Sequence, residues 1–71
     1  MIDKTYKIVE VVGVSEKSIS DAVQNALAKA RQTLRNVDWF ETKNIRGAVH
    51  GTECQFQVEV RIGFRLEDAP V

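Results

Sequence analysis

The segment from Phe56 to Leu66 alternates between apolar and polar side chains without a break. The apolar set is Phe56, Val58, Val60, Ile62, Phe64 and Leu66, and amide, charged or glycine residues stand between them. A period of two predicts a β-strand with one face on a core and the other face polar. Its length would be roughly 35 Å, about twice that of a usual strand. A short chain with such a segment must be organised around one long strand.

Size limits how this strand can be stabilised. The chain has 71 residues, which is enough for a single domain over residues 1–71. A domain of this size buries only about 60% of the surface that its unfolded chain exposes. One cysteine and one histidine leave no internal disulfide and too few ligands for a metal site. Self-association is the remaining source of stability.

The overall charge excludes several classes of partner. Ten Lys and Arg residues balance ten Asp and Glu residues, so nothing in the charge favours a nucleic acid or an anionic membrane surface. No apolar run approaches the ~20 residues needed to span a bilayer. The sequence begins without a secretory signal, and a lone thiol fits a reducing compartment. We therefore expect a cytoplasmic protein.

The first half of the chain predicts a strand and a helix. The β-branched segment Tyr6–Val12 is typical of a strand, which Gly13 would end. Ser18 is a favourable N-cap, with Asp21 in the first turn, and Asn36 is a suitable stop. Between them apolar residues recur at helical spacing: Ile19, Ala22, Val23, Ala26, Leu27, Ala30 and Leu34.

The second half predicts two further strands. The segment 39–47 is the second strand, residues 50–51 form the hairpin tip, and the alternating strand follows. The tail 67–71 is polar and expected to be loose. The order β-α-β-β predicts an α+β fold, a three-stranded antiparallel sheet with one amphipathic helix on one face.

Trp39 and Phe40 are neighbours, so in a strand their rings point to opposite faces. We expect Phe40 to join the core under the helix. Trp39 would then lie on the open face beside Gln57 and several charged side chains. An indole, an amide and guanidinium groups suit a planar ring edged with carbonyl and N–H groups. The face is either a subunit contact or a platform for such a ligand.

Two further features favour an oligomer. The first strand is apolar on both faces, as though it were covered on both sides. Gly63, within the long strand, is typical of a close approach by another stretch of backbone. The alternative is that Trp39 is an interface or core residue, that the arginines are surface ion pairs, and that Gln57 is simply solvated.

Several motifs, in order and over nearly the whole chain, resemble the dodecin family. They are Val-Val-Gly-Val-Ser at 11–15, Asp-Ala-Val-Gln-Asn-Ala at 21–26, Thr-Leu-Arg-Asn-Val-Asp-Trp-Phe-Glu at 33–41, Ile-Arg-Gly at 45–47, Phe-Gln-Val at 56–58 and Gly-Phe-Arg-Leu-Glu-Asp at 63–68. The resemblance implies a hollow dodecamer that binds flavins in pairs, each pair between two symmetry-related tryptophans. It implies FMN, with riboflavin or FAD also accepted, and coenzyme A in some members. The implied role is storage of flavin and protection from its photochemistry, not catalysis.

The resemblance also assigns residues. Trp39 would stack on the isoalloxazine ring, Gln57 would bond its polar edge, and Arg46 would contact flavin from an adjacent subunit. Four residues match positions near a phosphate tail or the nucleotide of coenzyme A: Thr33, Leu34, Arg35 and Arg65. Three lysines are weaker candidates for phosphate contacts: Lys29, Lys4 and Lys7.

Arg46 raises a geometric question, because its parity in the strand is opposite to that of Trp39. A bulge, or a contribution to a neighbouring subunit's site, is needed to bring it to the flavin.

Three alternatives to flavin storage remain. One is a carrier or buffer for coenzyme A or another nucleotide, using the region of Arg35 and Arg65. Another is a flavin-dependent redox enzyme, with His50 and Cys54 as base and nucleophile, although no carboxylate is evidently placed to orient the histidine. The last is a purely structural shell.

Overall fold

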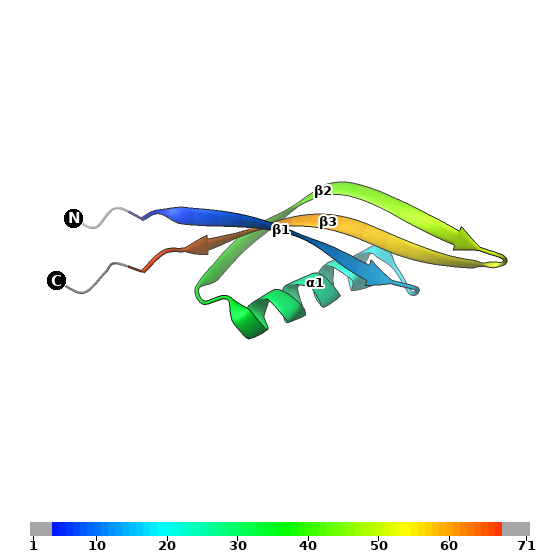
Figure 1. Cartoon of the computed structure of the whole chain (residues 1–71), viewed down its shortest axis with the longest axis horizontal. Coiled ribbons are helices and arrows are strands. Elements are labelled where there is room, and N and C mark those ends of the chain that lie inside the picture. The colour runs from blue at the N-terminus through cyan, green and yellow to red at the C-terminus, as the bar shows by residue number, and fades with distance from the viewer. Residues whose placement is uncertain (1–3, 68–71) are drawn as a thin grey trace.

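The computed structural model describes residues 4–67. Its elements are β1 (Tyr6–Ser15), α1 (Ile19–Thr33), β2 (Val37–His50) and β3 (Glu53–Arg65). The strands form one antiparallel sheet in the order β1-β3-β2, with α1 on one face (Figure 1). The predicted β-α-β-β fold is confirmed. Its long alternating strand is the central strand of the sheet, bonded on both edges.

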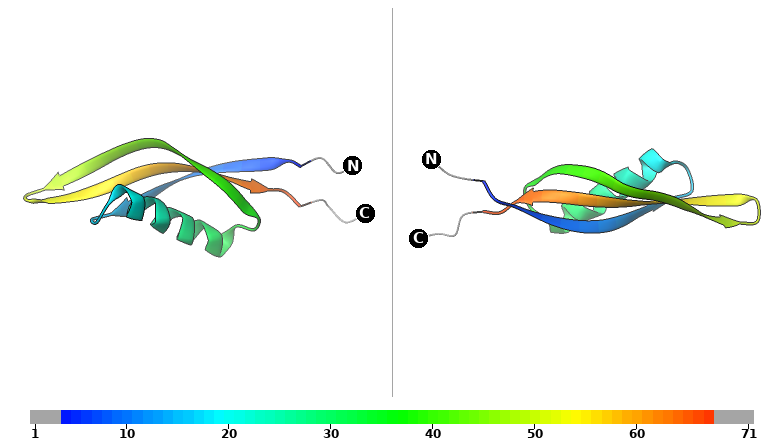
Figure 2. Two further views of the ribbon diagram at one scale, coloured as in Figure 1. Left: turned by 180° about the vertical axis from the view of Figure 1, so that it is seen from behind. Right: turned by 90° about the horizontal axis from the view of Figure 1, so that it is seen from above.

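The core lies between β3 and α1. Val58, Val60 and Ile62 have no exposed surface, and they face Ala22, Ala26, Leu27 and Ala30 of the helix. Side chains of β1 and the residues around the α1–β2 connection pack at the margin of this layer. Two further views show that the helix covers only one face of the sheet (Figure 2). The opposite face is open, as the alternation predicts.

Phe40 does not join this core, contrary to the prediction. It is opposite Ile62 in the sheet, so it faces the helix side, yet 47% of its surface is exposed. The reason is that α1 packs against β1 and β3 and scarcely touches β2. The ring of Phe40 therefore extends past the helix as an exposed apolar group.

The first strand continues three residues beyond its predicted end, through Gly13 to Ser15. A glycine in a strand normally weakens it, but here it has a packing role. A Cβ atom at position 13 would collide with the carbonyl oxygen of Ala22 and come within 2.9 Å of the Cβ of Ala26. Gly13 thus allows α1 to lie close against β1.

Both ends of α1 are defined by local hydrogen bonds. The amide of Asp21 donates to Oγ of Ser18 at 2.9 Å, which confirms the predicted N-cap. The Asp21 carboxylate does not complete a capping box but accepts from Oγ of Ser15 at 2.6 Å. The helix ends at Thr33, and Asn36, with a φ of 61°, turns the chain into β2.

The hairpin between β2 and β3 is longer than predicted. β2 begins at Val37 and reaches His50, β3 starts at Glu53, and the turn contains Gly51, with a φ of 63°, and Thr52. The hairpin projects beyond the end of α1 (Figure 1). Of the tail predicted to be loose, residues 68–71 lie outside the described part of the chain, and Glu67 is bonded to Arg35.

We expect Gly13→Ala to destabilise the subunit, because the added methyl group meets the backbone of Ala22 and forces α1 away from β1. Overpacking of this kind costs about 1–3 kcal/mol. The free energy of unfolding from denaturant titration provides the measurement. Gly47→Ala is the matched control, since its Cβ would come no closer than 3.3 Å to the carbonyl oxygen of Gln55. Equal stability of the two variants would contradict the packing role of Gly13.

Candidate functional site

Trp39 lies on the open face of the sheet, where its indole covers Gly63. The two residues are paired across β2 and β3, and a Cβ atom at position 63 would overlap the indole ring. Gly63 does mark a close approach, but the approaching group is the side chain of Trp39 in the same chain and not the predicted backbone, so Gly63 itself gives no evidence of an oligomer. The indole is still 38% exposed. It is therefore fixed on its inner side and free on its outer side.

Tyr6 and Asp38 adjoin this indole. The ring centroids of Tyr6 and Trp39 are 6.4 Å apart with an interplanar angle of 56°, and the Tyr6 hydroxyl donates to Oδ2 of Asp38 at 2.7 Å. Tyr6 belongs to β1, so its side chain crosses the central strand to reach β2. A register shift between Val37 and Trp39 is what lets Asp38 share the open face with its neighbour. The hydrogen bond to Asp38 raises the pKa of Tyr6.

A second register shift, between Thr42 and Asn44, brings Arg46 to the open face. Arg46 is thereby opposite Gln57, and its Nε donates to Oε1 of Gln57 at 3.0 Å. Of the two alternatives that the parity of Arg46 left open, the structure shows the bulge. Beyond this point β2 presents to the open face the residues that a straight strand would have turned toward the helix.

Glu59 connects the side chains around this second bulge. Its Oε2 accepts from Nδ2 of Asn44 at 2.7 Å and from Nη1 of Arg46 at 3.1 Å. These contacts, with that from Asn44 first, lower the pKa of Glu59. Two more ion pairs cross the same face, Arg61 with Glu41 at 2.8 Å and Lys43 with Glu10 at 3.4 Å. Exposed pairs of this kind contribute little stability, so they can exchange partners when a ligand arrives.

Trp39 and Gln57 are far apart within one subunit. Trp39 is opposite Gly63, whereas Gln57 is six positions away along β3, or about 20 Å of strand. A single planar ring does not span that distance. If both residues contact one ligand, they belong to different copies of the chain.

A second region lies where α1 ends and β3 ends. Thr33, Leu34, Arg35 and Arg65 line one cavity of about 260 Å³. Nη1 of Arg35 is 3.1 Å from the Glu67 carboxylate. The structure thus brings together the four residues assigned to a phosphate or nucleotide.

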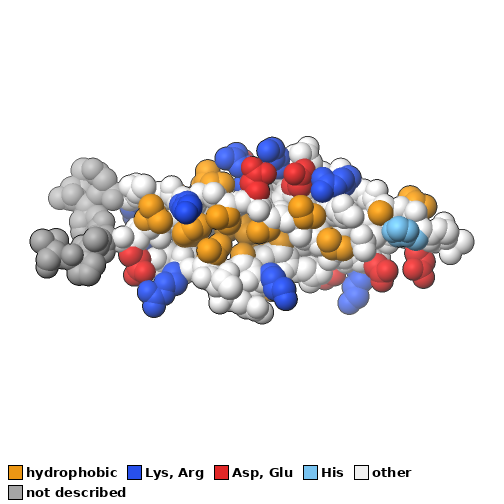
Figure 3. All heavy atoms as spheres, viewed as in Figure 1, with side chains coloured by type: hydrophobic (Ala, Val, Ile, Leu, Met, Phe, Trp, Pro, Cys, Tyr) orange, Lys and Arg blue, Asp and Glu red, His pale blue; other side chains and the backbone are white. Residues whose placement is uncertain are grey.

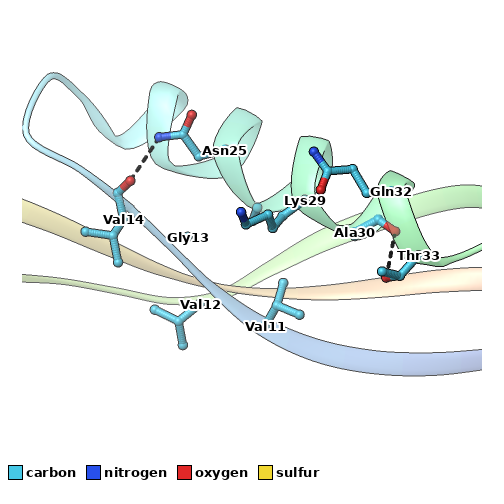
Figure 4. Close-up of a pocket in the computed structure, with 10 residues that line it drawn as sticks. Val11, Val12, Gly13, Val14, Asn25, Lys29, Ala30, Gln32 and Thr33 are labelled. Carbon is cyan, nitrogen blue, oxygen red and sulfur yellow. Dashed lines mark hydrogen bonds between the residues drawn. The ribbon is translucent and has the colours of Figure 1, made fainter.

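The three lysines are placed differently. Lys29 lines a separate, mainly apolar cavity of about 570 Å³ between β1 and α1, with Thr33 at its rim (Figure 4). Lys4 and Lys7 are exposed at the beginning of the described chain, outside both cavities. The structure does not gather them around one phosphate within a subunit.

His50 and Cys54 do not form a base and nucleophile pair. His50 is opposite Glu53 and Cys54 is opposite Val49, so the two side chains point to opposite faces of the hairpin. Among residues 4–67, no cluster of three His, Cys, Asp or Glu side chains is arranged for a metal ion. In the same range no helix is long and apolar enough to cross a membrane.

Apolar side chains remain on the surface in unusual number for such a small domain. On the open face of β1 these are Ile8, Val12 and Val14, each at least 40% exposed. In Figure 3 hydrophobic side chains form a band along the middle of the molecule, between groups of charged side chains. The prediction that β1 is apolar on both faces is confirmed, and one face lacks a cover within the subunit.

A small β-α-β-β subunit with an uncovered sheet and an exposed, fixed indole has the features expected in a self-assembling ligand-binding protein. The family model for dodecin matches residues 5–67. The chain belongs to the dodecin family.

Particular relatives agree with this assignment. A dodecin from Thermus thermophilus is 52% identical over 66 residues, which cover 92% of this chain and 96% of that protein. A crystal structure of a Thermus thermophilus protein matches with a TM-score of 0.90 at 50% identity, covering 94% of this chain and all (100%) of the other. The dodecin from Streptomyces coelicolor matches with a TM-score of 0.89 at 44% identity, over 97% and 100% of the two chains. The predicted dodecameric assembly is consistent with these relatives.

We expect Gly63→Ala to displace the indole of Trp39 from the sheet, since the new methyl group would occupy the position of the ring. Trp39 is the only tryptophan in the chain, so its emission spectrum reports the change directly. A shift of the emission to longer wavelength is expected, because the displaced ring gains contact with water. Gly47→Ala is the control and should leave the spectrum unchanged. An unshifted spectrum in Gly63→Ala would show that Gly63 does not position the indole.

We expect the single tyrosine to titrate above its usual pKa of about 10, because its neutral hydroxyl donates to Asp38. The stabilisation from this bond is complete below the usual value and is lost as the pH rises through the higher folded-state value. Ultraviolet difference titration of the phenol provides the measurement. Asp38→Asn should bring the pKa down toward that of free tyrosine. An equal tyrosine pKa in the wild type and in Asp38→Asn would refute the contribution of Asp38.

Proposed function

We propose that this protein binds flavin between its subunits, stores it and quenches its photochemistry. FMN is the proposed ligand, with riboflavin or FAD as variants. The observation that carries the proposal is the indole of Trp39, fixed over Gly63 and exposed on the outer side of an uncovered sheet. Membership of the dodecin family supports the same reading.

Energetics require a second subunit at this site. Stacking of two rings adds only ~0.5–1.5 kcal/mol beyond area burial, whereas micromolar affinity requires about 8 kcal/mol. Most of the affinity must come from burying both faces of the ring at roughly 25 cal/mol per Å². One indole on an open sheet covers one face only. Closing the other face needs a further planar ring, either the indole of a second copy of the chain or a second ligand that is stacked on the first and covered in turn by that indole.

The side chains along the open face fit the polar parts of a flavin. The Gln57 amide can donate to a carbonyl and accept from an N–H of the ring edge. Arg46, which bonds Gln57, lies beside it. Both are too far from Trp39 of their own subunit, so the proposed site combines Trp39 of one copy with Gln57 and Arg46 of another.

The phosphate of FMN needs a cation. Arg65 is two residues from Gly63 on β3, on the same face as the indole, and its side chain is exposed. Guanidinium and phosphate form strong paired hydrogen bonds. Arg35 lines one cavity with Arg65. Among the described carboxylates, only that of Glu67 pairs with the Arg35 guanidinium.

Bound flavin would supply a photo-excitable electron acceptor, and the protein would supply the electron donor and the enclosure around the ring. Trp39, in contact with the ring, can give an electron and take it back, so absorbed light ends as heat. The enclosing subunits would exclude oxygen and substrates from the ring. The proposed role is therefore non-enzymatic, in the reducing cytoplasm that the lone, exposed Cys54 suits.

A second candidate function is a carrier or buffer for coenzyme A. The cavity lined by Thr33, Leu34, Arg35 and Arg65 favours this function. Two guanidinium groups, a threonine hydroxyl and backbone groups line the same cavity, and all of these can bind a nucleotide phosphate. Native mass spectrometry of protein taken directly from cells would show whether flavin, coenzyme A or both remain bound.

We expect Trp39→Ala to abolish tight FMN binding and the quenching of FMN fluorescence, because one face of the ring loses its cover. Titration of FMN fluorescence against purified protein provides the measurement. Trp39→Phe should retain part of the binding with weaker quenching, since phenylalanine is a poorer electron donor. Lys17→Ala, in the exposed bend before α1, is the control.

Wild-type binding and quenching in Trp39→Ala would refute the stacking proposal. A wild-type protein that assembles but binds neither flavin nor coenzyme A would instead support the structural shell. The visible absorption spectrum of the purified protein, with its mass from light scattering, separates these outcomes.

A further inference from the structure

Tyr6 and Asp38 have no part in flavin stacking as proposed above, yet they are built against the stacking residue. The Tyr6 ring lies 6.4 Å from that of Trp39, within the usual range of an aromatic pair. The Tyr6 hydroxyl donates to Oδ2 of Asp38 at 2.7 Å. An indole, a phenol and a carboxylate thus stand in sequence on one face of the sheet.

We propose that Tyr6, with Asp38 as its proton acceptor, is a secondary electron donor that restores oxidised Trp39. The proposal rests on the proposed flavin function, which supplies the oxidant, a photo-excited isoalloxazine ring. It concerns a step that stacking alone does not provide. It protects the only tryptophan of the chain when the first electron is slow to return.

The step balances in electrons and protons. Trp39 gives one electron to the photo-excited ring and becomes an indole cation radical. Tyr6 gives one electron to this radical and its hydroxyl proton to Asp38, so the indole is restored and a neutral tyrosyl radical remains. When the electron returns from the ring to Tyr6, the proton returns from Asp38. No atom is gained or lost over the cycle.

The chemistry of the two side chains sets the direction of the step. At neutral pH a phenol that can release its proton is easier to oxidise than an indole. An oxidised phenol is a strong acid, so a carboxylate within hydrogen-bond distance accepts the proton without any movement of the chain. Resting Tyr6 keeps its proton at neutral pH, because the usual pKa of a phenol is about 10 and the hydrogen bond to Asp38 raises the pKa further.

The sheet explains why these groups meet. Tyr6 and Trp39 lie on the two outer strands and approach each other across β3. Tyr6 is opposite Arg65 and Trp39 is opposite Gly63, so the two rings meet diagonally across the central strand. The register shift at Asp38 places the carboxylate on the same face. A bond that merely fastened β1 to β2 would need neither the aromatic contact nor a group able to accept a proton.

The composition makes the test unambiguous, because the chain has one tyrosine and one tryptophan. Pulse radiolysis of the flavin-free protein with the azide radical oxidises the indole directly. In the wild type the absorption of the tryptophanyl radical should decay as that of the tyrosyl radical rises. In Tyr6→Phe the tyrosyl signal should be absent and the tryptophanyl radical should persist roughly an order of magnitude longer. Decay of the tryptophanyl radical in the wild type without any rise of a tyrosyl signal would overturn the proposal.

Asp38→Asn separates proton transfer from structure, since the amide oxygen can still accept the hydrogen bond but not the proton. Electron transfer should slow several-fold and recover when a small base such as imidazole is added. A wild-type rate in Asp38→Asn, or a slow rate that no base restores, would remove Asp38 from the proposed role.

A final arm uses the FMN-loaded protein under steady illumination in air. Tyr6→Phe should lose Trp39 to oxidation several-fold faster than the wild type, as measured by peptide mass spectrometry, while the quenching of FMN stays unchanged. Equal loss of Trp39 in the wild type and in Tyr6→Phe would overturn the protective role of Tyr6. Because the radiolysis needs no flavin, failure to bind FMN would count against the proposed function and not against the Tyr6–Trp39 transfer.

Discussion

The contact between Trp39 and Gly63 is the constraint on which the site depends. The absence of a side chain at position 63 opens a place on the central strand, and the indole occupies it. This fixes one face of the ring to the sheet and leaves the other exposed. The indole held there in turn contacts the ring of Tyr6, which comes from the far strand. Replacing one glycine would disturb the indole, the phenol and the carboxylate together.

Two irregularities in β2 decide which side chains reach the open face. The first places Asp38 beside Trp39, and the second reverses the parity of the strand so that Arg46 meets Gln57. In a regular strand these residues would face the helix side, where α1 scarcely covers β2. Bulges re-aim side chains at the cost of one unpaired residue. The open face therefore has two centres, an aromatic one near Gly63 and a polar one near Gln57.

Much of this could be predicted from residues whose role is local. The alternation of the last strand, the Ser18 cap and the opposed directions of Trp39 and Phe40 each depend on near neighbours in sequence. The parity of Arg46 was enough to require either a bulge or a contribution to a neighbouring subunit's site.

What could not be predicted depends on contacts between distant segments. From the sequence alone Gly13 is interpreted as the end of a strand, because its close approach to Ala22 depends on the packing of α1. Likewise Phe40 is interpreted as a core residue, because the path of α1 across the sheet is not encoded locally. The cluster of Tyr6 and Asp38 needs the strand order, which places β3 between them, and periodicity does not encode strand order. A lone tyrosine and an aspartate beside the lone tryptophan were the only signals available.

The surface left by this fold links binding to assembly. The subunit exposes apolar side chains on the open face of β1 and on the helix side of β2, including Val12, Phe40 and Val49. Residues 4–67 contain no second helix to cover them, so another copy of the chain is the simplest cover. A ligand held between copies binds only the assembled state, and mass action then stabilises that state by an amount that grows with the logarithm of the ligand concentration. A flavin held between Trp39 of one copy and Gln57 of another would thus act as part of the subunit contact, and the protein would be most stable when it is full.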